Sequence, residues 1–468
     1  MNSCHHFKSK FSPVGAQIPS VVFLAFKRLS SSSVQRSSMS LRSMEIARKQ
    51  RQIDRHIEKN FGRQSEVESV PESVRSPYRR STPPAGLPLS KILSANSFPL
   101  SLTESFGHYM ARHDLDMFQT DLLSTLPFYG QDASKFDSCG RTSEIVKTVI
   151  DDSGNYINEF VMYPPGYDPA YDQGSNSRYN HLVMVHGYGA GLGFFLKNFD
   201  QISAPQNHKS EWVVHAIDLL GYGCSSRPDF PHNEPLESTK VEDWFTQSLQ
   251  VWFDRRGLSG LPKDKVMMCS HSMGAYITAK LNMKSPNLFG KVLMVSPAGI
   301  NEVNEETAPK IPKWFELLWN QNVSPFALVR YTGPLGSIFV SGWTSRRFSM
   351  DTITQQEQDL LHRYTYAIFN AKGSGEYVLN YLLRAGGVPR RPLIREISKL
   401  KCDTVWLYGA EDWMDREAGQ MCSEYISRTA THTSRYIELA NAGHHLYLDD
   451  AERFNRIVID EMNKMENV

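Results

Sequence analysis

The sequence predicts an α/β fold in which a mostly parallel central sheet is covered by helices on both faces. Six short, almost continuously apolar segments alternate with segments of helical character between residues 181 and 439. Strands that are buried on both faces have this composition, because both rows of their side chains pack against helices. The expected parallel strands are 181–186, 212–218, 266–270, 292–296, 404–408 and 435–439, preceded by an antiparallel pair at 144–151 and 156–163.

The composition of the 468-residue chain excludes several classes of protein. Its 51 Lys and Arg residues balance 50 Asp and Glu residues, so the basic excess of a nucleic-acid-binding protein is absent. Hydrophobic residues make up 40% of the chain, which is enough for a large core. No apolar run reaches the roughly 18 residues of a membrane-spanning helix. The six cysteines include no C-x-x-C pair, so we expect neither a disulfide framework nor a zinc site.

The first 100 residues differ in composition from the rest. No acidic residue precedes Glu45, whereas basic residues and serines are frequent. An acid-free, Arg- and Ser-rich N-terminus is typical of a mitochondrial transit peptide, which we predict at residues 1–45; an untargeted tail is the alternative. Residues 46–100 are rich in Arg, Ser, Glu and Pro, which favours a flexible linker. The folded domain is expected at residues 101–468.

A segment of about 100 residues, at about 300–400, separates the fourth predicted parallel strand from the fifth. It is rich in Trp, Phe, Pro and Arg, which predicts a lid inserted over the active edge of the sheet. Its apolar cluster favours contact with a lipid surface, and its arginines could bind phosphate. The alternative is that the cluster is lid core and the arginines are solvated. The cluster comprises Trp314, Phe315, Leu317, Leu318 and Trp319; the arginines are Arg330, Arg346, Arg347, Arg384, Arg390, Arg391 and Arg395.

The strongest sign of chemistry is the pentapeptide S-H-S-M-G at 270–274. It follows the third predicted parallel strand and precedes a helical run at 275–284. A serine hydroxyl is a poor nucleophile unless a turn holds it beside a base. The strand–turn–helix context is typical of a G-x-S-x-G nucleophile turn, although Ser270 replaces the first glycine. We therefore predict that Ser272 is a nucleophile.

A glycine-rich loop, H-G-Y-G-A-G at 186–191, follows the first predicted parallel strand. Such a loop lets a backbone N–H approach the oxyanion that forms when a serine attacks a carbonyl. We predict that the N–H groups of Tyr188 and Met273 form this oxyanion hole. A nucleotide-binding loop is disfavoured, because the spacing is not that of G-x-G-x-x-G.

The acid and the base of such a site follow the nucleophile along the chain. Asp412 comes after the fifth predicted parallel strand, and His444 comes after the sixth. Asp412 would hold the imidazole of His444 in the tautomer that accepts the serine proton. Glu411 is the alternative acid and His445 is the alternative base.

His444 also begins an H-x-x-x-x-D string that ends at Asp449. This spacing is found in glycerolipid acyltransferases, in which the histidine deprotonates the acceptor hydroxyl. Because His444 already belongs to the predicted triad, the string leaves acyl transfer open as an alternative.

Five ordered motifs within about residues 140–465 resemble one lipid-acting branch of the α/β-hydrolase superfamily. They read HGYGAGLGFFLKNFD, AIDLLGYGCSSRPDF, SHSMGAY, YGAEDWMD and NAGHHLYLDD. The branch includes mitochondrial cardiolipin-specific deacylases, lysophosphatidic acid acyltransferases and N-acyl-phospholipid hydrolases. It also includes lipase coactivators that lack the nucleophile, whereas this chain keeps Ser272. The resemblance implies a mitochondrial serine phospholipase in which Ser272, Asp412 and His444 carry the reaction.

These observations lead to one expected function and two alternatives. We expect deacylation of a glycerophospholipid, with cardiolipin giving monolyso-cardiolipin, by a protein peripheral to the matrix face of the mitochondrial inner membrane. The alternatives are an acyl-CoA-dependent lysophosphatidic acid acyltransferase and a non-catalytic lipase-binding scaffold. No metal ion or organic cofactor is expected, and the sequence indicates neither a nucleic-acid partner nor a particular protein partner.

Overall fold

The computed structural model describes residues 98–130, 137–232, 237–302, 312–348 and 353–465. All of them belong to the second of the two compact units of the chain, 88–468. The predicted transit peptide and nearly all of the predicted linker lie outside the described residues and stay predictions.

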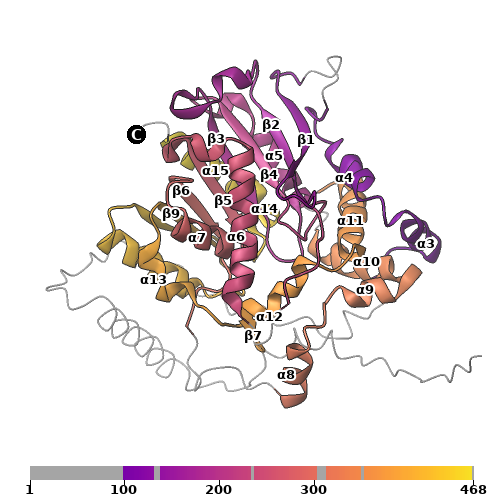
Figure 1. Cartoon of the computed structure of the whole chain (residues 1–468). Helices are drawn as coiled ribbons and strands as arrows, with labels where there is room; N and C mark the ends of the chain where they lie inside the picture. Colours follow the sequence, from indigo (N-terminus) through magenta and orange to yellow (C-terminus); the bar gives the residue numbers. More distant parts are fainter. Residues whose placement is uncertain (1–97, 131–136, 233–236, 303–311, 349–352, 466–468) are drawn as a thin grey trace, which may run out of the picture. The chain divides into compact units, whose positions relative to one another are not determined.

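Eight strands form one sheet in the order β1-β2-β4-β3-β5-β6-β9-β10 (Figure 1). The first two strands pair antiparallel with each other, and β2 pairs antiparallel with β4. All other neighbours are parallel, so the predicted α/β fold and its leading antiparallel pair are confirmed. The strands are β1 Thr142–Val149, β2 Tyr156–Tyr163, β3 Asn180–Val185, β4 Trp212–Ile217, β5 Val266–His271, β6 Lys291–Val295, β9 Asp403–Gly409 and β10 Ser434–Leu439.

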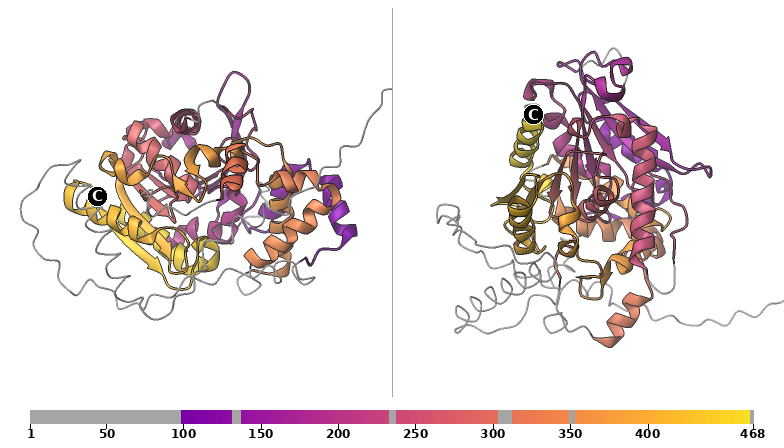
Figure 2. Two further views of the ribbon diagram at one scale, coloured as in Figure 1. Left: turned by 90° about the horizontal axis from the view of Figure 1, so that it is seen from below. Right: turned by 60° about the vertical axis from the view of Figure 1, so that its left-hand side comes forward.

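Helices cover both faces of this sheet, and their apolar stripes form two core clusters. On one face α5 (Leu196–Ile202) and α15 (Ala451–Met465) contribute to a cluster that includes Phe199 and Phe454. On the other face α6 (Ser238–Arg255), α7 (Met273–Lys284) and α13 (Arg416–Thr429) contribute to a second cluster. The right-hand view of Figure 2 shows the sheet between α15 and α6. Alternate side chains of each buried strand enter the two clusters, which explains why the strands are apolar throughout.

The parallel strands bring the predicted site residues to one edge of the sheet. The loops after β3, β5, β6, β9 and β10 all leave from the carboxyl ends of parallel neighbours. Ligands of open α/β sheets bind at this edge, because the loops meet there. The sequence motifs with glycine, serine, acid and histidine all lie on these loops.

The inserted segment predicted at about 300–400 is mainly helical, and we call its described part the cap. It consists of α8 (Lys313–Asn320), α9 (Ala327–Tyr331), α10 (Gly336–Arg347), α11 (Gln355–Asn370), α12 (Leu379–Leu382) and the short hairpin of β7 (Leu383–Arg384) and β8 (Val388–Pro389).

Two helices that precede the whole sheet extend the cap, which the sequence analysis did not foresee. Helix α3 (Leu102–Ala111) contacts α10, and α4 (Leu115–Leu123) contacts α11. Figure 1 shows both beside the cap helices. Ser101 and Glu104 form a capping box at the start of α3, and this was the only sequence signal for it.

The cap only partly matches the expected lipid-binding chemistry. The side chains of Trp314, Phe315 and Leu318 lie outside the described residues, whereas Leu317 is exposed. Four of the seven arginines pair with carboxylates of the protein, so they are not free phosphate donors. The four are Arg330, Arg347, Arg391 and Arg395. Within the described ranges, no helix combines the length and the apolar character that a membrane crossing requires.

Candidate active site

The turn between β5 and α7 holds Ser272 in an unusual backbone conformation. Its φ of 53° and ψ of −116° are strained for a residue with a side chain. The turn is tight: a Cβ on Gly274 would lie 2.4 Å from the carbonyl oxygen of His186. Ser270, which replaces the usual first glycine, is tolerated because its hydroxyl lies 2.8 Å from that of Thr278 on α7. The structure thus has the nucleophile turn that the pentapeptide predicted.

The structure brings Ser272, His444 and Asp412 together in a hydrogen-bonded series. The Nε2 atom of His444 lies 3.1 Å from Oγ of Ser272, and its Nδ1 atom lies 3.1 Å from Oδ1 of Asp412. If Nδ1 carries the ring proton and donates a hydrogen bond to the carboxylate, Nε2 is free to accept the serine proton. This arrangement can activate a serine for attack on an acyl carbonyl.

The environment of Asp412 favours its charged form. Burial opposes ionisation, but the hydrogen bond and charge of His444, the hydroxyl of Ser296 and the backbone N–H of Met414 outweigh it and lower the pKa of Asp412. An ionised carboxylate at this point stabilises the imidazolium that forms when His444 accepts a proton.

The two alternatives left open by the sequence occupy other positions. Glu411 is exposed to solvent. His445 is half-buried against the rings of His271 and Tyr447, with ring centroids 5.1 and 5.8 Å away. Its pKa is well below the usual range because burial, and then the charge of Arg347, disfavour the imidazolium. Both ring nitrogens of His444 are already engaged with the other two members of the series, so geometry favours Asp412 and His444.

Ser296 is a site residue that the sequence analysis missed. It directly follows β6, is fully buried and has a φ of 44°. Its hydroxyl donates to Oδ2 of Asp412, and its N–H donates to the carbonyl of Leu407 at 2.7 Å. The signal in the sequence was a polar residue at the carboxyl end of an apolar strand.

The predicted oxyanion donors lie beside the nucleophile. Met273 is the first residue of α7, and the first N–H groups of a helix have no acceptor within the helix. A Cβ on Gly187 would lie 3.0 Å from Cβ of Ser272, so the backbone of the glycine-rich loop approaches the nucleophile closely. Tyr188, which would supply the other N–H group, is the next residue of this loop. Its side chain is held by the cap, since its hydroxyl donates to the carbonyl of Glu376 at 3.1 Å and its ring stacks on Phe326.

The fully buried carboxylate of Asp218 shapes the glycine-rich loop, and this residue was also missed. One oxygen accepts from the N–H of Leu192 at 2.7 Å, and the other accepts from Cys224 and Asn158, each at 2.8 Å. Burial raises the pKa of this carboxyl. A Cβ on Gly191 would lie 2.2 Å from the hydroxyl of Tyr364 and 3.0 Å from the same carboxylate, which explains the glycine there.

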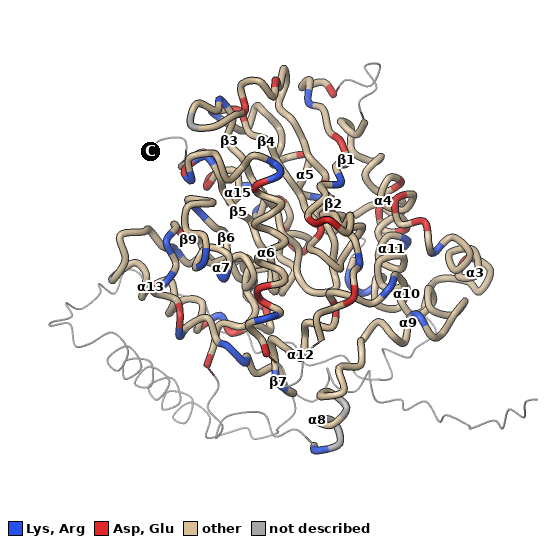
Figure 3. Tube along the Cα trace, in the orientation of Figure 1, with Lys and Arg blue, Asp and Glu red and all other residues tan. Residues whose placement is uncertain are grey.

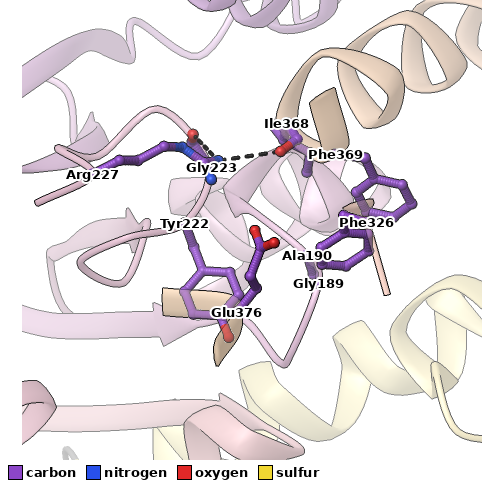
Figure 4. A pocket seen from close by; sticks show the side chains of 9 residues that line it. All are labelled: Gly189, Ala190, Tyr222, Gly223, Arg227, Phe326, Ile368, Phe369 and Glu376. Carbon is purple, nitrogen blue, oxygen red and sulfur yellow. Dashed lines mark hydrogen bonds between the residues drawn. The ribbon is translucent and has the colours of Figure 1, made fainter. Parts of the chain in front are cut away.

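A small pocket lies beside this loop (Figure 4). Apolar side chains of Phe326, Ile368 and Phe369 line one part, whereas Arg227 and Glu376 bring opposite charges to it. The guanidinium of Arg227 donates to the carbonyls of Gly223, Ile368 and Lys372. The remaining lining residues are Gly189, Ala190, Tyr222 and Gly223.

Trp413, directly after the acid, packs its ring against that of the base. Its ring centroid lies 4.7 Å from that of His444, and the side chain is 71% exposed.

The H-x-x-x-x-D string does not form an acid–base pair in the described site. The ring nitrogens of His444 face Ser272 and Asp412, whereas Asp449 accepts the N–H of Gly443 at 3.0 Å and pairs with Arg347 at 3.1 Å. Asp449 therefore supports the loop that carries His444. Among the described residues, no cluster of three or more His, Cys, Asp or Glu side chains is arranged to bind a metal ion.

The family model of the α/β-hydrolase fold matches residues 180–451, and the chain belongs to this family. A rice protein (Oryza sativa subsp. japonica) named probable 1-acylglycerol-3-phosphate O-acyltransferase is 33% identical over 295 residues, which is 60% of this chain and 67% of that protein. The 1-acylglycerol-3-phosphate O-acyltransferase of Arabidopsis thaliana is 32% identical, over 59% of this chain and 65% of that protein. The match thus spans about two thirds of these plant relatives.

A mouse relative carries a different name. The (lyso)-N-acylphosphatidylethanolamine lipase of Mus musculus is 29% identical over 61% of this chain and 80% of that protein. Together these relatives confirm the resemblance to a lipid-acting branch of the family. Among solved structures, the carboxylesterase CesB from Bacillus subtilis has a TM-score of 0.46 and 14% identity, covering 76% of this chain and 98% of that chain.

Proposed function

We propose that this protein is a serine hydrolase that removes an acyl chain from a glycerophospholipid. The observation that carries the proposal is the hydrogen-bonded series Ser272–His444–Asp412, because it supplies a nucleophile, a base and an orienting acid at one sheet edge. Relatives named for reactions on glycerolipids support a lipid ester as the substrate.

The reaction begins when His444 accepts the proton of Ser272 and the serine oxygen bonds to the acyl carbonyl carbon. The N–H groups of Tyr188 and Met273 hold the resulting oxyanion. The ester C–O bond then breaks, His444 returns its proton to the leaving lysophospholipid oxygen, and the acyl group stays on Ser272. Water, deprotonated by His444, attacks the acyl-enzyme and releases the fatty acid, which restores the serine hydroxyl.

Cardiolipin in mitochondria is the substrate and location that we favour. The five motifs resemble those of mitochondrial cardiolipin deacylases, and the acid-free N-terminus is typical of a transit peptide. The product would be monolyso-cardiolipin, formed at the matrix face of the inner membrane. Residues 1–45 fused to a fluorescent reporter should direct the reporter into mitochondria. A reporter that stays in the cytosol would refute the mitochondrial location.

Peripheral contact with the lipid surface would bring the site to its substrate. Leu102, Phe106 and Met110 form a stripe along α3 and are 67, 54 and 63% exposed. Figure 3 shows that α3 carries mainly uncharged residues. Exposed apolar stripes favour an interface in which they leave water. Replacement of Phe106 and Met110 with serine should weaken co-sedimentation with phospholipid vesicles. Replacement of the exposed Tyr171 with serine should leave co-sedimentation unchanged. Native binding by the Phe106 and Met110 variant would refute this contact.

Acyl transfer to a lysophospholipid is the second candidate. The names of the plant relatives favour it, and the same acyl-enzyme would serve, with a lysolipid hydroxyl in place of water. The position of Asp449 argues against a separate acyltransferase pair, because this carboxylate binds Gly443 and Arg347.

One experiment separates the candidates. The full chain and its Ser272→Ala variant are incubated with vesicles of mitochondrial phospholipids, acyl-CoA and a lysophospholipid, and the products are followed by mass spectrometry. Free fatty acid and monolyso-cardiolipin that are absent from the variant support the hydrolase. Newly acylated lysolipid without free fatty acid would refute the hydrolase and support the acyltransferase. Equal, negligible turnover by both folded proteins would refute both and leave a lipase-binding scaffold.

A further inference from the structure

An ion pair joins the cap to the segment that follows the loop of the base. Arg347 is the last residue of the cap helix α10, and Asp449 is the last residue of α14 (Leu446–Asp449), directly after the His444 loop. An Nη atom of Arg347 lies 3.1 Å from Oδ1 of Asp449, and the two side chains are only 20 and 23% exposed. A partly buried pair is screened less by water than a surface pair, so it can hold two elements in register.

Hydrogen bonds hold the backbone on each side of His444. Before it, the N–H of Gly443 donates to Oδ2 of Asp449 at 3.0 Å. At the residue itself, the carbonyl oxygen lies 2.9 Å from Nε2 of His271. After it, the carbonyl of His445 accepts a longer contact of 3.5 Å from Arg347. The backbone that carries the imidazole is therefore held by His271, Asp449 and Arg347, and the last two do not touch the reacting atoms.

One of these two residues belongs to the cap and the other to the sheet's last loop. Arg347 contacts both the carboxylate of Asp449 and the backbone after His444. A displacement of α10 would move the guanidinium away, and Asp449 would then hold Gly443 without its own partner. The geometry of the base loop is thus tied to the position of the cap.

We propose that Arg347 and Asp449 form a latch that places His444 for catalysis only while helix α10 is seated over the site. Both are positioning residues that act through the backbone of the His444 loop. In the latch, Asp449 has a structural task, and the H-x-x-x-x-D string is not an acyltransferase acid–base pair. The proposal rests on the proposed function, since it requires that His444 activates Ser272.

The latch predicts a particular kinetic signature. A displacement of about 1 Å of a catalytic group can lower a rate about 100-fold. Loss of the latch moves the base but leaves the surfaces that bind lipid unchanged. We therefore expect Arg347→Met to lower kcat about 10- to 100-fold and to change KM less than twofold. Arg347→Lys keeps a cation that reaches Asp449, and it should restore activity to within about threefold of the native protein.

The test measures the reaction of Ser272 directly. The full chain and its variants are treated with a fluorophosphonate probe, which labels a serine only when its base is in place, and turnover is followed with phospholipid vesicles. The variants are Arg347→Met, Asp449→Asn, the double variant and Arg347→Lys. Asparagine can still accept from Gly443 but cannot form an ion pair with Arg347, so it removes only the ion pair. Arg363→Met is the matched control, because it breaks the ion pair of Arg363 with Asp359 elsewhere on the cap.

The expected result is equal slowing in both single variants, no further slowing in the double variant and native labelling in the control. Labelling within twofold of native in Arg347→Met overturns the latch, as do additive losses in the double variant. The latch would also be overturned if Asp449→Asn stopped acyl transfer to a lysolipid and Arg347→Met did not. Asp449 would then be the acid of an acyltransferase. A native protein whose Ser272 is never labelled overturns the proposed function itself, and the latch with it. Melting temperatures distinguish loss of position from loss of fold.

Discussion

Replacement of Ser296 with alanine tests whether the acid of the site needs its second hydrogen bond. The hydroxyl of Ser296 donates to Oδ2 of Asp412, while Oδ1 receives both Nδ1 of His444 and the N–H of Met414. Without the Ser296 hydroxyl, the buried Oδ2 atom of Asp412 loses this hydrogen-bond donor. The carboxylate can then rotate away from the imidazole.

The size of the effect follows from the type of bond. A hydrogen bond to a charged group contributes about 1.5–3 kcal/mol, so we expect Ser296→Ala to lower the free energy of unfolding by about 2 kcal/mol. Each 1.4 kcal/mol of lost transition-state stabilisation is about tenfold in rate, and we expect kcat to fall about tenfold or more. Because Ser296 helps to lower the pKa of Asp412, the variant should also lose activity at a higher pH than the native protein as the solution is acidified.

A glycine variant separates the hydrogen bond from backbone strain. The φ of 44° at Ser296 is a conformation that costs residues with a Cβ about 1–2 kcal/mol, and glycine avoids this cost. Ser296→Gly should therefore be more stable than Ser296→Ala but equally slow. The assay is hydrolysis of a short-chain ester as a function of pH, with thermal unfolding of the same samples. A kcat within twofold of native in both variants, with an unchanged pH profile, would refute the reasoning.

Three further predictions address other parts of the site and the cap. Gly187→Ala should lower kcat at least tenfold, because its Cβ would lie 2.7 Å from Nδ1 of His271 and displace the oxyanion loop; native turnover of the purified variant would contradict this. Asp412→Asn should lower kcat about 10³–10⁴-fold by favouring the wrong imidazole tautomer, whereas Glu411→Gln should leave it unchanged, and the reverse order would exchange the two assignments. Burial lowers the pKa of His362, a residue of α11 that faces α10, to about 3, below the unfolded value of about 6.5. The stabilisation from its neutral form is therefore complete above pH 6.5 and is lost as the pH falls. The free energy of unfolding should be about 2 kcal/mol lower at pH 5 than at pH 6.5. In a chemical denaturation series, His362→Gln should abolish most of this difference.

The fold and the members of the candidate triad could be located from sequence because each lies at the end of a recognisable strand. The strand before Ser272 is apolar throughout and is followed by small residues, a local pattern that few other structures produce. The predicted strands agree with the structure to within about one to two residues, since buried parallel strands are marked by composition.

The residues that support the site could not be located in this way. Ser296 and Asp412 are 116 positions apart, and Arg347 and Asp449 are 102 apart. Their pairing depends on how the cap and the neighbouring strands pack, which leaves no periodic pattern in the sequence. Asp218 was missed for the same reason, because a buried acid whose partners are mainly backbone N–H groups has no recognisable spacing.

The helices before the sheet have a consequence for how the protein is made. Phe118, Leu122 and Leu123 of α4 are buried, yet their partner helix α11 begins only at Gln355, more than 200 residues later. At ~5–20 residues per second of synthesis, these side chains wait roughly 10–50 s for the helix that covers them. The nascent chain therefore carries these apolar side chains of α4 uncovered until α11 of the cap has been synthesised.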